Sequence, residues 1–493
     1  MNTTLRLAAV TALYRQGGYG REFYIVHRSR QLPFLGGFHA LPGGSVDIAD
    51  HELPVERARS RSAFVAAGIR ELFEEAGVLL ALGAEHLSQA QLDDGRKAVL
   101  ERSQTFATFL NHHTLTLDGE GLVPIGVWVT PPYSRTMFEA QYFAVALPEG
   151  QTPSIWPGEL DHGEWLTAPA ALARHAMGEL FLAYPVLKTL EAFAQAGAFS
   201  EICTQLAARE PGPPLIGAEL LTGVQILPLL SPTLPPATRT NCYILGGPEL
   251  VVVDPAPPEP AEQANLLQFV RTLEQQGRYV REIWLSHHHP DHIGAAATLS
   301  RELRVGIAAH PATAEVLAGK LTVTRLLCDG DVTELPMLMG PPARWRALHT
   351  PGHARGHLCF YEERLHTLLS GDTVVTNGTV VVPPHEGGMR AYLASLRRLL
   401  QLELGFMLPS HGPPVALARE RIQRYLDHRA ERELAIVRAL SQPKTIETLA
   451  MEIYAGLAPG AMKLAQINIA AHLDKLIEEA KVEQKGSCFQ NVI

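Results

Sequence analysis

The sequence predicts a multidomain α/β protein, with two α/β units followed by a small helical tail. The chain has 493 residues, enough for two to four domains at roughly 100–200 residues each. Pro/Gly-rich segments at 209–214 and 410–414 interrupt it. Each long unit contains an apolar, strand-like run that leads into a loop and a set of polar side chains. We therefore expect domains at 1–208, 219–418 and 420–493, with a linker at 209–218.

The composition is typical of a soluble protein, with 46% hydrophobic and 19% charged residues. The net charge of −9 gives no general attraction to nucleic acid or to an anionic membrane. Five scattered cysteines without a CxxC pair predict reduced thiols and a cytoplasmic location. No apolar run approaches the roughly 20 residues of a membrane span. The N-terminal stretch predicts a first strand rather than a signal peptide.

The first unit contains a tight loop followed by a helix. Residues 38–44 predict a strand that runs into a loop at Gly43 and Gly44. The helix begins near Ala63 and stops at Gly77, because glycine favours the left-handed position after a helix end. Its apolar face is formed by Val65, Ile69, Leu72 and Ala76. A separate face carries Glu71, Glu74 and Glu75 at i, i+3, i+4 spacing.

These three glutamates have two interpretations. Carboxylates crowded on one helical turn repel one another unless a cation compensates them. Oxygen-rich clusters of this kind suit Mg²⁺ or Mn²⁺. The alternative is a solvated acidic face with no ligand. The residues around the glutamates favour the metal site.

Those residues form a known motif. The segment Arg70-Glu71-Leu72-Phe73-Glu74-Glu75-Ala76-Gly77-Val78, downstream of Gly43-Gly44, resembles the Nudix box of nucleoside-diphosphate-X hydrolases. The resemblance covers most of residues 5–195 and implies an α/β/α sandwich. It implies that Glu71, Glu74 and Glu75 hold the Mg²⁺ or Mn²⁺ that activates water against a diphosphate. Arg70 would pin the helix or the loop. Gly43 and Gly44 would contact the substrate phosphates.

The motif departs from the usual box in one respect. The spacing from Gly44 to Arg70 is longer, because 47–62 is inserted, and Ser62 stands where the box has an intermediate Glu. This long-loop form resembles the Nudix branch that includes peroxisomal coenzyme A diphosphatases. The branch resemblance implies a nucleoside-diphosphate-linked substrate such as coenzyme A or an acyl-CoA, by analogy only.

The second unit carries a dense set of metal-grade ligands. The apolar run Ile283-Trp284-Leu285 leads directly into Ser286-His287-His288-His289-Pro290-Asp291-His292, the pattern His-x-His-x-Asp-His. A strand that ends in such a loop predicts a hydrolytic metal centre. Further ligand-type side chains follow other apolar runs, namely Asp254, His353, Asp372 and His411.

This series of motifs resembles the metallo-β-lactamase superfamily over about 220–415. The resemblance implies an αββα sandwich that binds two Zn²⁺ ions, with a bridging, metal-bound hydroxide as the nucleophile. One metal would be held by His287, His289 and His353. The other would be held by Asp291, His292 and His411. Asp372 would bridge the two metals. Asp291 would also be a catalytic residue. Asp254 would orient the histidine loop from outside the coordination shell.

The ligand set also bears on the substrate. True zinc β-lactamases have a Cys where this chain has Asp372. An Asp bridge resembles the thioesterases of the glyoxalase II type and the nucleases of the superfamily, so antibiotic hydrolysis is not expected as the main activity. The remaining histidines of the unit are interpreted as structural or substrate-facing, namely His288, His310, His349 and His357.

The tail predicts three helices and a terminal hairpin. The helices lie at about 421–440, 446–454 and 469–480, and 481–486 predicts a strand and turn. The arrangement resembles the winged helix that follows the metal domain in the β-lactamase-like endoribonuclease family. From Arg421 onward the tail has ten Lys/Arg and nine Asp/Glu, a net charge of about +1, without the basic face of most nucleic-acid modules. Docking on the metal domain and contact with nucleic acid both stay open.

The leading hypothesis is a bifunctional metal-dependent hydrolase. The first unit would be a Nudix diphosphatase. The second would be a dinuclear zinc enzyme that hydrolyses an ester, a thioester or a phosphodiester. The alternatives are an endoribonuclease activity in the second half and a ligand-sensing winged-helix regulator. The expected partner is a nucleotide or CoA-type small molecule, with RNA as a further candidate, no membrane and a homodimer as a candidate assembly.

Overall fold

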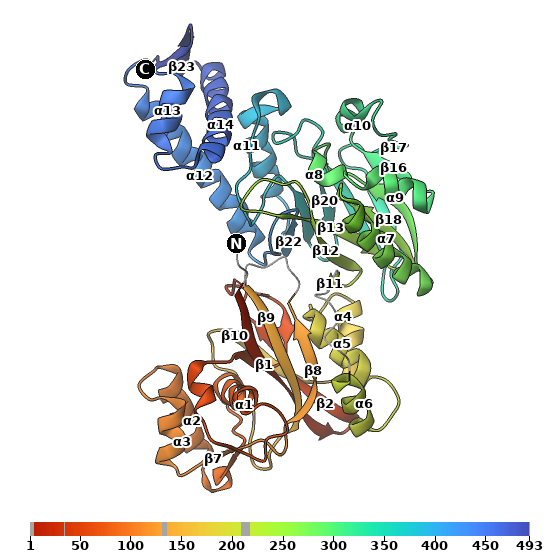
Figure 1. The fold of residues 1–493 in the computed structure, drawn as a ribbon, viewed down its shortest axis with the longest axis vertical. Coiled ribbons are helices and arrows are strands. Elements are labelled where there is room, and N and C mark those ends of the chain that lie inside the picture. Colours follow the sequence, from red (N-terminus) through yellow and green to blue (C-terminus); the bar gives the residue numbers. More distant parts are fainter. Residues whose placement is uncertain (1–3, 34, 131–135, 209–216, 493) are drawn as a thin grey trace. The chain divides into compact units, whose positions relative to one another are not determined.

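The computed structural model describes residues 4–33, 35–130, 136–208 and 217–492 (Figure 1). Contacts divide the chain into two compact units, 1–222 and 223–493. The expected linker at 209–218 falls mostly outside the described residues, and the three-part division of the sequence stays a prediction. No helix in the described part of the chain is long and apolar enough to cross a membrane. All five cysteines are free thiols, as the sequence predicts.

A mixed sheet forms the centre of the first unit, in the order β10-β2-β1-β9-β8. These strands are β1 (Thr4–Gly17), β2 (Gly20–Arg28), β8 (Val123–Val129), β9 (Thr136–Ala146) and β10 (Leu160–Thr167). The short strand β3 (His39–Ala40) pairs with β2, and β4 (Gly43–Ser45) pairs with β1. A separate small sheet contains β5 (Val55–Glu56), β7 (Thr116–Asp118) and β6 (Ala81–Leu82). The unit ends near β11 (Ala218–Leu221).

Helices cover both faces of the central sheet because its strands alternate apolar side chains between the two faces. On one face Ala9 and Leu13 of β1 pack in a core with helix α1 (Ser62–Ala76). That core also includes residues of α2 (Gln89–Leu100) and α3 (Phe106–His112). On the other face Ala12 packs with α4 (Ala168–Ala176), α5 (Tyr184–Phe193) and α6 (Phe199–Ala207). The first unit is therefore the predicted α/β/α sandwich.

Two sheets form the centre of the second unit. One has the order β12-β13-β14-β15-β16-β17 and the other β18-β19-β20-β21-β22. The first contains β12 (Val224–Leu230), β13 (Arg239–Gly246), β14 (Glu249–Val253), β15 (Tyr279–Trp284), β16 (Gly306–Ala309) and β17 (Arg325–Leu326). The second contains β18 (Val332–Leu335), β19 (Ala343–His349), β20 (Leu358–Glu362), β21 (Thr367–Gly371) and β22 (Phe406–Pro409).

Helices lie against the outer faces of these sheets. Helices α7 (Pro260–Gln275) and α9 (Ala296–Leu303) share a buried core with the first sheet. Helix α11 (Gly388–Leu399) shares a core with the second sheet. The short helices are α8 (Pro290–Ile293), α10 (Pro311–Leu317) and the 3₁₀ turn η3 (Pro384–Glu386). This is the predicted αββα sandwich.

The tail consists of three helices and a hairpin, as the sequence predicts. They are α12 (Ala418–Ala439), α13 (Ile446–Ile453), α14 (Pro459–Glu478), β23 (Val482–Lys485) and β24 (Cys488–Asn491). The tail has its own small core, which includes Leu449, Leu473 and Leu476. It belongs to the same compact unit as the αββα sandwich, and both α12 and α14 contact α11.

Candidate functional site

The predicted ligands of the second unit lie at strand ends from both sheets. Strand β14 ends just before Asp254, and β15 leads into the loop that carries His287 and His289. From the second sheet, β19 leads toward His353, β21 ends just before Asp372 and β22 leads to His411. Because β14 pairs in parallel with β15, and β21 with β22, each pair of strands presents its carboxyl ends at one edge. The fold thereby brings together residues that lie far apart in the sequence.

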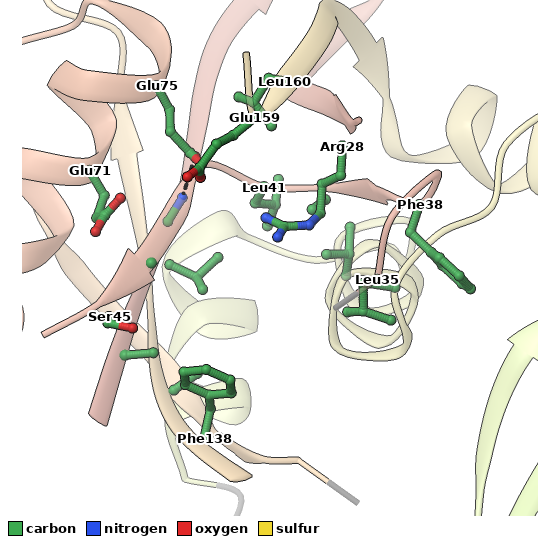
Figure 2. Close-up of a pocket in the computed structure, with 18 of the residues that line it drawn as sticks. Arg28, Leu35, Phe38, Leu41, Ser45, Glu71, Glu75, Phe138, Glu159 and Leu160 are labelled. Carbon is green, nitrogen blue, oxygen red and sulfur yellow. Dashed lines mark hydrogen bonds between the residues drawn. The ribbon is translucent and has the colours of Figure 1, made fainter. Parts of the chain in front are cut away.

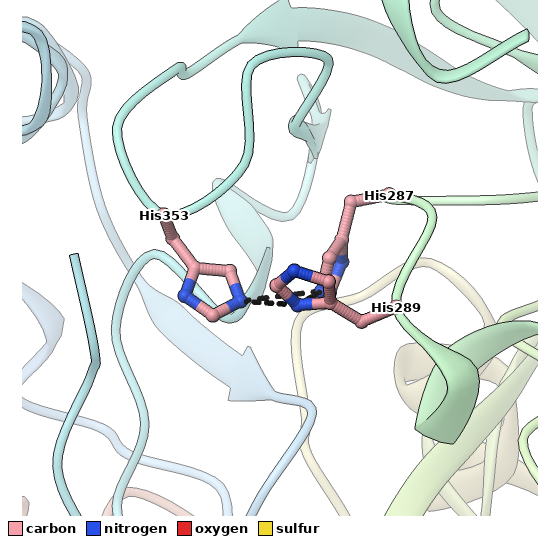
Figure 3. Close-up of side chains that lie close together, drawn as sticks. All are labelled: His287, His289 and His353. Carbon is pink, nitrogen blue, oxygen red and sulfur yellow. Dashed lines mark hydrogen bonds between the residues drawn. The ribbon is translucent and has the colours of Figure 1, made fainter. Parts of the chain in front are cut away.

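Three imidazoles form the first ligand group. His353 Nε2 lies 2.9 Å from His289 Nδ1 and 3.3 Å from His287 Nε2. His287 Nε2 lies 3.0 Å from His289 Nδ1. Figure 3 shows the three rings turned toward one common point from two separate segments of the chain. Three nitrogens that converge in this way are the donor set of a Zn²⁺-type site.

A second group lies beside the first. Asp291, His292 and His411 offer ligand atoms within 4.8 Å of one another. Asp372 Oδ1 is 3.5 Å from His292 Nε2 and 3.3 Å from His411 Nε2. Its other oxygen, Oδ2, is 3.6 Å from His353 Nε2 of the first group. Asp372 therefore stands between the two groups, as expected of a bridging carboxylate.

Hydrogen bonds to the second ring nitrogen orient four of the histidines. His353 Nδ1 lies 2.7 Å from Val381 O, and His411 Nδ1 lies 2.9 Å from Arg239 O. A carbonyl can only accept, so these rings carry the proton on Nδ1 and leave Nε2 free to bind a cation. His287 Nδ1 contacts Ser286 Oγ at 2.9 Å, and His292 Nδ1 contacts Asp254 at 2.9 Å. Sequence patterns do not reveal partners such as the Val381 and Arg239 carbonyls.

The electrostatics of the cluster fit a divalent cation. His292 Nε2 and Asp372 Oδ1 are buried and have no hydrogen-bond partner. Burial lowers the pKa of His289 to about 2 and that of His287 well below its usual range, so both rings are neutral and ready to coordinate. Burial opposes charge on His292, but the carboxylates of Asp372, Asp291 and Asp254 raise its pKa well above the usual range. Positive charge is favoured here, and a cation supplies it.

Asp254 holds the histidine loop through hydrogen bonds to Ser286 and His292. Its carboxylate accepts hydrogen bonds from the Ser286 backbone N–H at 2.7 Å and from Ser286 Oγ at 2.6 Å, besides its contact with His292. Asp254 is 2% exposed and has a left-handed backbone, with φ of 51°. A non-glycine residue in that region is strained and persists only where its surroundings hold it. The structure thus places Asp254 where the sequence predicts it, behind the ligands.

Substituting Asp254→Asn should weaken binding of cobalt(II) about 10–100-fold, because His292 loses a charged partner outside the coordination shell. Competition with a chelator measures this affinity. Glu282→Gln is the matched control, since Glu282 pairs with Arg325 away from the ligands. Wild-type affinity in the Asp254 variant would contradict the role given to this carboxylate.

The other histidines of the unit have identifiable contacts. His357 Nε2 lies 3.0 Å from the Asp372 backbone N–H and accepts from it, so this buried ring positions the bridging residue. His288 lies 3.4 Å from Glu386 at the edge of the cluster. His310 and His349 stack with ring centroids 4.0 Å apart. None of these four belongs to the ligand groups found among the described residues.

In the first unit, Arg70 is the centre of the predicted site. Helix α1 ends at Ala76, and Gly77 follows with φ of 72°, as the sequence predicts. The Arg70 guanidinium binds both oxygens of Asp50, with Nε and Nη2 each at 2.9 Å. It also donates to Ser45 O at 2.8 Å and to Glu71 at 2.8 Å. Arg70 therefore links helix α1 to strand β4 through Ser45 and to the inserted segment through Asp50.

Asp50 is a site residue that the sequence analysis misses. It lies in the 3₁₀ turn η1 (Ile48–His51), inside the inserted segment 47–62, and it is fully buried. The usual box has a glutamate where this chain has Ser62, and Asp50 supplies a carboxylate for Arg70 from a different place. Burial opposes charge on Arg70, but the hydrogen bonds with Asp50 and the nearby Glu71 hold its pKa above the usual range.

Replacing Asp50 by Asn should destabilise helix α1 by about 3–5 kcal/mol, because the buried Arg70 guanidinium loses the carboxylate that binds it through both oxygens. Amide hydrogen exchange along α1 reports this local opening free energy. Asp47→Asn is the matched control: its side chain is 67% exposed and 3.9 Å from Arg70, so the expected cost is below about 1 kcal/mol. Equal effects of the two substitutions would contradict the account.

Glu75 lines a cavity of about 1080 Å³ in the first unit. The Gly43 N–H donates to Glu75 Oε2 at 2.8 Å. The sequence predicts a loop at Gly43 and Gly44, but both residues lie in strand β4, which pairs with β1, so this bond joins β4 to the helix. Figure 2 shows the Glu159 carboxylate turned toward Glu75, with the Arg28 guanidinium facing the same cavity. Glu159 precedes β10, far from the glutamate helix in sequence, and only the fold reveals it as a neighbour of Glu75. Apolar side chains line much of the remainder, among them Leu35, Phe38, Leu41, Phe138 and Trp128.

The three helix glutamates are close but do not converge. Among the described residues, the groups with three ligand atoms within 4.8 Å do not include Glu71, Glu74 and Glu75. Glu71 and Glu74 both face Arg70. Burial raises the pKa of Glu71 to about 7 and that of Glu75 to about 8, and it also raises the pKa of Glu74. Glu71, Glu74 and Asp50 share Arg70, and Arg28 also acts on Glu75. Four carboxylates outnumber these two guanidinium groups, so the chemistry of the set fits a divalent cation.

A further group, His39, His162 and Glu164, also lies within 4.8 Å in the first unit. His39 Nδ1 accepts a hydrogen bond from the Phe181 N–H at 3.2 Å, so the neutral ring carries its proton on Nε2. Glu164 is engaged by Arg174 at 2.7 Å. Both contacts oppose coordination of a metal, and we assign no metal to this group.

The fold and the ligand groups of the second unit together define a metal-dependent αββα domain. Residues 235–411 match the family model described as "Metallo-beta-lactamase superfamily". The second unit therefore carries a metallo-beta-lactamase domain, whose family consists of hydrolases and binds divalent metal.

Curated relatives agree with this assignment. A Beta-lactamase-like protein 2 homolog of Caenorhabditis elegans is 27% identical over 250 residues, covering 50% of this chain and 80% of its own length. An Atrochrysone carboxyl ACP thioesterase of Aspergillus terreus is 28% identical over 234 residues, covering 47% of this chain and 66% of its own length. These matches cover about half of this chain.

Solved structures show two kinds of likeness. A Beta-lactamase domain protein from Burkholderia ambifaria has a TM-score of 0.50 at 22% identity, covers 56% of this chain and 93% of its own, and shows the fold. A NUDIX hydrolase from Alicyclobacillus acidocaldarius has a TM-score of 0.36 at 28% identity, covering 43% of this chain and 100% of its own. We therefore interpret the first unit from its own residues and not from this structural match.

Proposed function

We propose that this chain is a bifunctional hydrolase with two independent metal sites. The first unit would cleave a nucleoside-diphosphate-linked substrate, with coenzyme A or an acyl-CoA as the leading candidate, using Mg²⁺ or Mn²⁺. The second would hydrolyse a thioester or another ester using two Zn²⁺ ions. The observation that carries the proposal is the placement of seven ligand side chains in two adjoining groups in the second unit. In the first unit, the Glu71, Glu74 and Glu75 side chains of the Nudix-type box lie at one cavity.

In the second unit, His287, His289 and His353 would hold one Zn²⁺, and Asp291, His292 and His411 the other, with Asp372 between them. When bound, the two ions supply an activated water at neutral pH and positive charge for a developing oxyanion. The protein keeps the rings in the binding tautomer through the carbonyls of Val381 and Arg239. Asp254 and His357 hold the histidine loop and the bridging carboxylate in place. This support limits the reorganisation required during reaction.

Two features favour a thioester as the substrate of the second unit. The bridging side chain is the carboxylate of Asp372 rather than a thiolate. A relative with 28% identity is an acyl carrier protein thioesterase by name. Acyl-CoA and acyl carrier protein thioesters share the same reacting group, so acyl-CoA substrates are a suitable first probe.

In the first unit, Glu71, Glu74 and Glu75 would hold the Mg²⁺ or Mn²⁺, which supplies charge stabilisation for a diphosphate. Arg28 faces the same cavity and would bind a phosphate oxygen. Gly43 and Gly44 of β4 allow close approach: a Cβ at Gly44 would lie 2.5 Å from the Glu71 carboxylate. The apolar remainder of the cavity would hold the group attached to the diphosphate.

An endoribonuclease activity is the weaker candidate for the second unit. A winged helix that binds RNA needs a basic surface. Four of the five lysines in the tail pair with neighbouring acids, through Lys444–Glu452, Lys475–Glu433, Lys481–Glu479 and Lys485–Glu483. The arginine Arg429 is buried. The same pairing disfavours a DNA-binding regulator.

The test is one substrate panel run on wild-type protein, Glu75→Gln and His287→Ala. The panel contains coenzyme A, acyl-CoA thioesters and single-stranded RNA. We expect His287→Ala to lose thioester hydrolysis and keep diphosphate cleavage, and Glu75→Gln to do the reverse. Intact acyl-CoA thioester with cleaved RNA would refute the thioesterase assignment. RNA cleavage that survives His287→Ala would come from a contaminating nuclease.

A further inference from the structure

We propose that the C-terminal tail positions a metal ligand of the second unit, with Asn468 and Arg429 as positioning residues for His353. The tail is thus a structural part of the metal centre as well as an appended domain. The inference rests on the proposed metal-binding role of His353. Neither residue belongs to the motifs of the metal domain.

The link begins at His353. Its Nδ1 donates to the Val381 carbonyl at 2.7 Å, and this bond selects the tautomer whose Nε2 faces His287 and His289. Val381 belongs to the segment that connects β21 to η3, and this segment is not part of a strand. The orientation of His353 therefore depends on a carbonyl that no sheet holds in place.

Asn468 of helix α14 supplies the missing support. Its Oδ1 accepts from the Val382 N–H at 2.9 Å, and its Nδ2 lies 3.5 Å from the Val380 carbonyl. In an extended segment, the polar groups of residues i and i+2 point to one edge and those of residue i+1 to the other. One amide side chain that contacts Val380 and Val382 therefore directs the Val381 carbonyl the opposite way, toward His353.

Arg429 of helix α12 holds the same segment independently. Its Nη2 donates to Val380 O at 2.6 Å, and the guanidinium lies 5.4 Å from the Tyr392 ring centroid. Arg429 is 1% exposed and Asn468 5% exposed, so water competes little for these bonds. Arg421 and Tyr425 of α12 hold Val375 O nearer to Asp372, at 2.7 Å and 3.0 Å. Helices α12 and α14 of the tail thus both hold the segment between Asp372 and η3.

The arrangement predicts that loosening the tail contact changes metal binding. If Val380 and Val382 lose their partner, the Val381 carbonyl can turn away and His353 can rotate or change tautomer. Loss of a partner outside the coordination shell lowers metal affinity about 10–100-fold. Asn468 acts one bond further away, so we expect about a tenfold loss, the lower end of that range.

The experiment measures cobalt(II) affinity by chelator competition and records the visible absorption spectrum of the cobalt protein, using the full chain. Asn468→Ala should bind cobalt about tenfold more weakly and show an altered spectrum. Arg429→Gln is a second variant with the same expected effect, so the test does not depend on whether a single variant folds. Asn468→Asp keeps the acceptor for Val382 and should lie closer to wild type than Asn468→Ala.

Glu433→Gln is the matched control. It removes the 2.7 Å ion pair between Glu433 of α12 and Lys475 of α14, which loosens the tail without touching residues 380–382. We expect wild-type cobalt affinity and spectrum from this variant. The inference is overturned if Asn468→Ala and Arg429→Gln bind cobalt like wild type, or if Glu433→Gln weakens binding equally. If the wild-type protein binds no cobalt, the proposed metal centre itself fails.

Discussion

Substituting Asp372→Asn should reduce kcat/KM of the second unit by at least about 10³-fold. Asp372 is within 3.6 Å of nitrogens from both ligand groups, so it is placed to serve both metals. The amide keeps the shape but loses the charge that neutralises the cations. Metal ions contribute several kcal/mol of charge stabilisation, and each 1.36 kcal/mol is tenfold in rate. Thioester hydrolysis by wild type and variant measures the effect.

The variant should stay folded, because the Asp372 backbone N–H keeps its bond to His357. Asp329→Asn is the control, since this exposed carboxylate follows another strand and pairs with Arg398 away from the ligands. It should retain wild-type activity. An Asp372→Asn enzyme within tenfold of wild type would show that this carboxylate does not bridge two metals.

Glu75→Gln should lower the diphosphatase activity of the first unit by about 10²–10³-fold. Glu75 is held by the Gly43 N–H and lies beside Glu159 in the wall of the cavity. Glutamine cannot supply the negative charge that a Mg²⁺ or Mn²⁺ ligand requires, and loss of about 3–4 kcal/mol of charge stabilisation corresponds to this factor. Release of the nucleotide product from coenzyme A, with magnesium present, is the measurement.

Burial raises the pKa of Glu75 to about 8, so the wild-type carboxyl group and the glutamine of the variant should respond differently to magnesium and to pH. The carboxylate form needed for metal binding is favoured by more magnesium or by higher pH, whereas glutamine responds to neither. Glu85→Gln is the matched control, because Glu85 is exposed and lies outside the box. Wild-type activity of Glu75→Gln at the same limiting magnesium concentration would contradict the role of Glu75 as a ligand.

The sequence predicts the parts of each site that depend on local pattern. The His-x-His-x-Asp-His run follows an apolar strand, and β15 ends where that pattern predicts. Helix α1 ends at Ala76, because Gly77 follows in the left-handed conformation that glycine favours. Both sandwiches are expected only from the two family resemblances. The placement of Asp254, Asp372 and His411 near the histidine loop agrees with their positions after apolar runs.

The parts that the sequence does not reveal depend on contacts between distant segments. Asp50 lies in an insertion with no recognisable pattern, and only the fold brings it to Arg70. The carbonyls of Val381 and Arg239 are backbone atoms, which any residue type could supply. Asn468 is a buried polar residue on a tail helix, and periodicity places it facing inward without indicating its partner. The winged-helix assignment, the role of each ligand and the substrates stay predictions.

The central claim is that seven side chains of the second unit hold two metal ions independently of the first unit. Elemental analysis of tightly bound transition metal per chain, on wild type, Asp372→Asn and Glu75→Gln, tests it most directly. The account predicts two equivalents in wild type and in Glu75→Gln, and a clear loss in Asp372→Asn. Equal metal content in all three proteins, or a loss in Glu75→Gln, would contradict it.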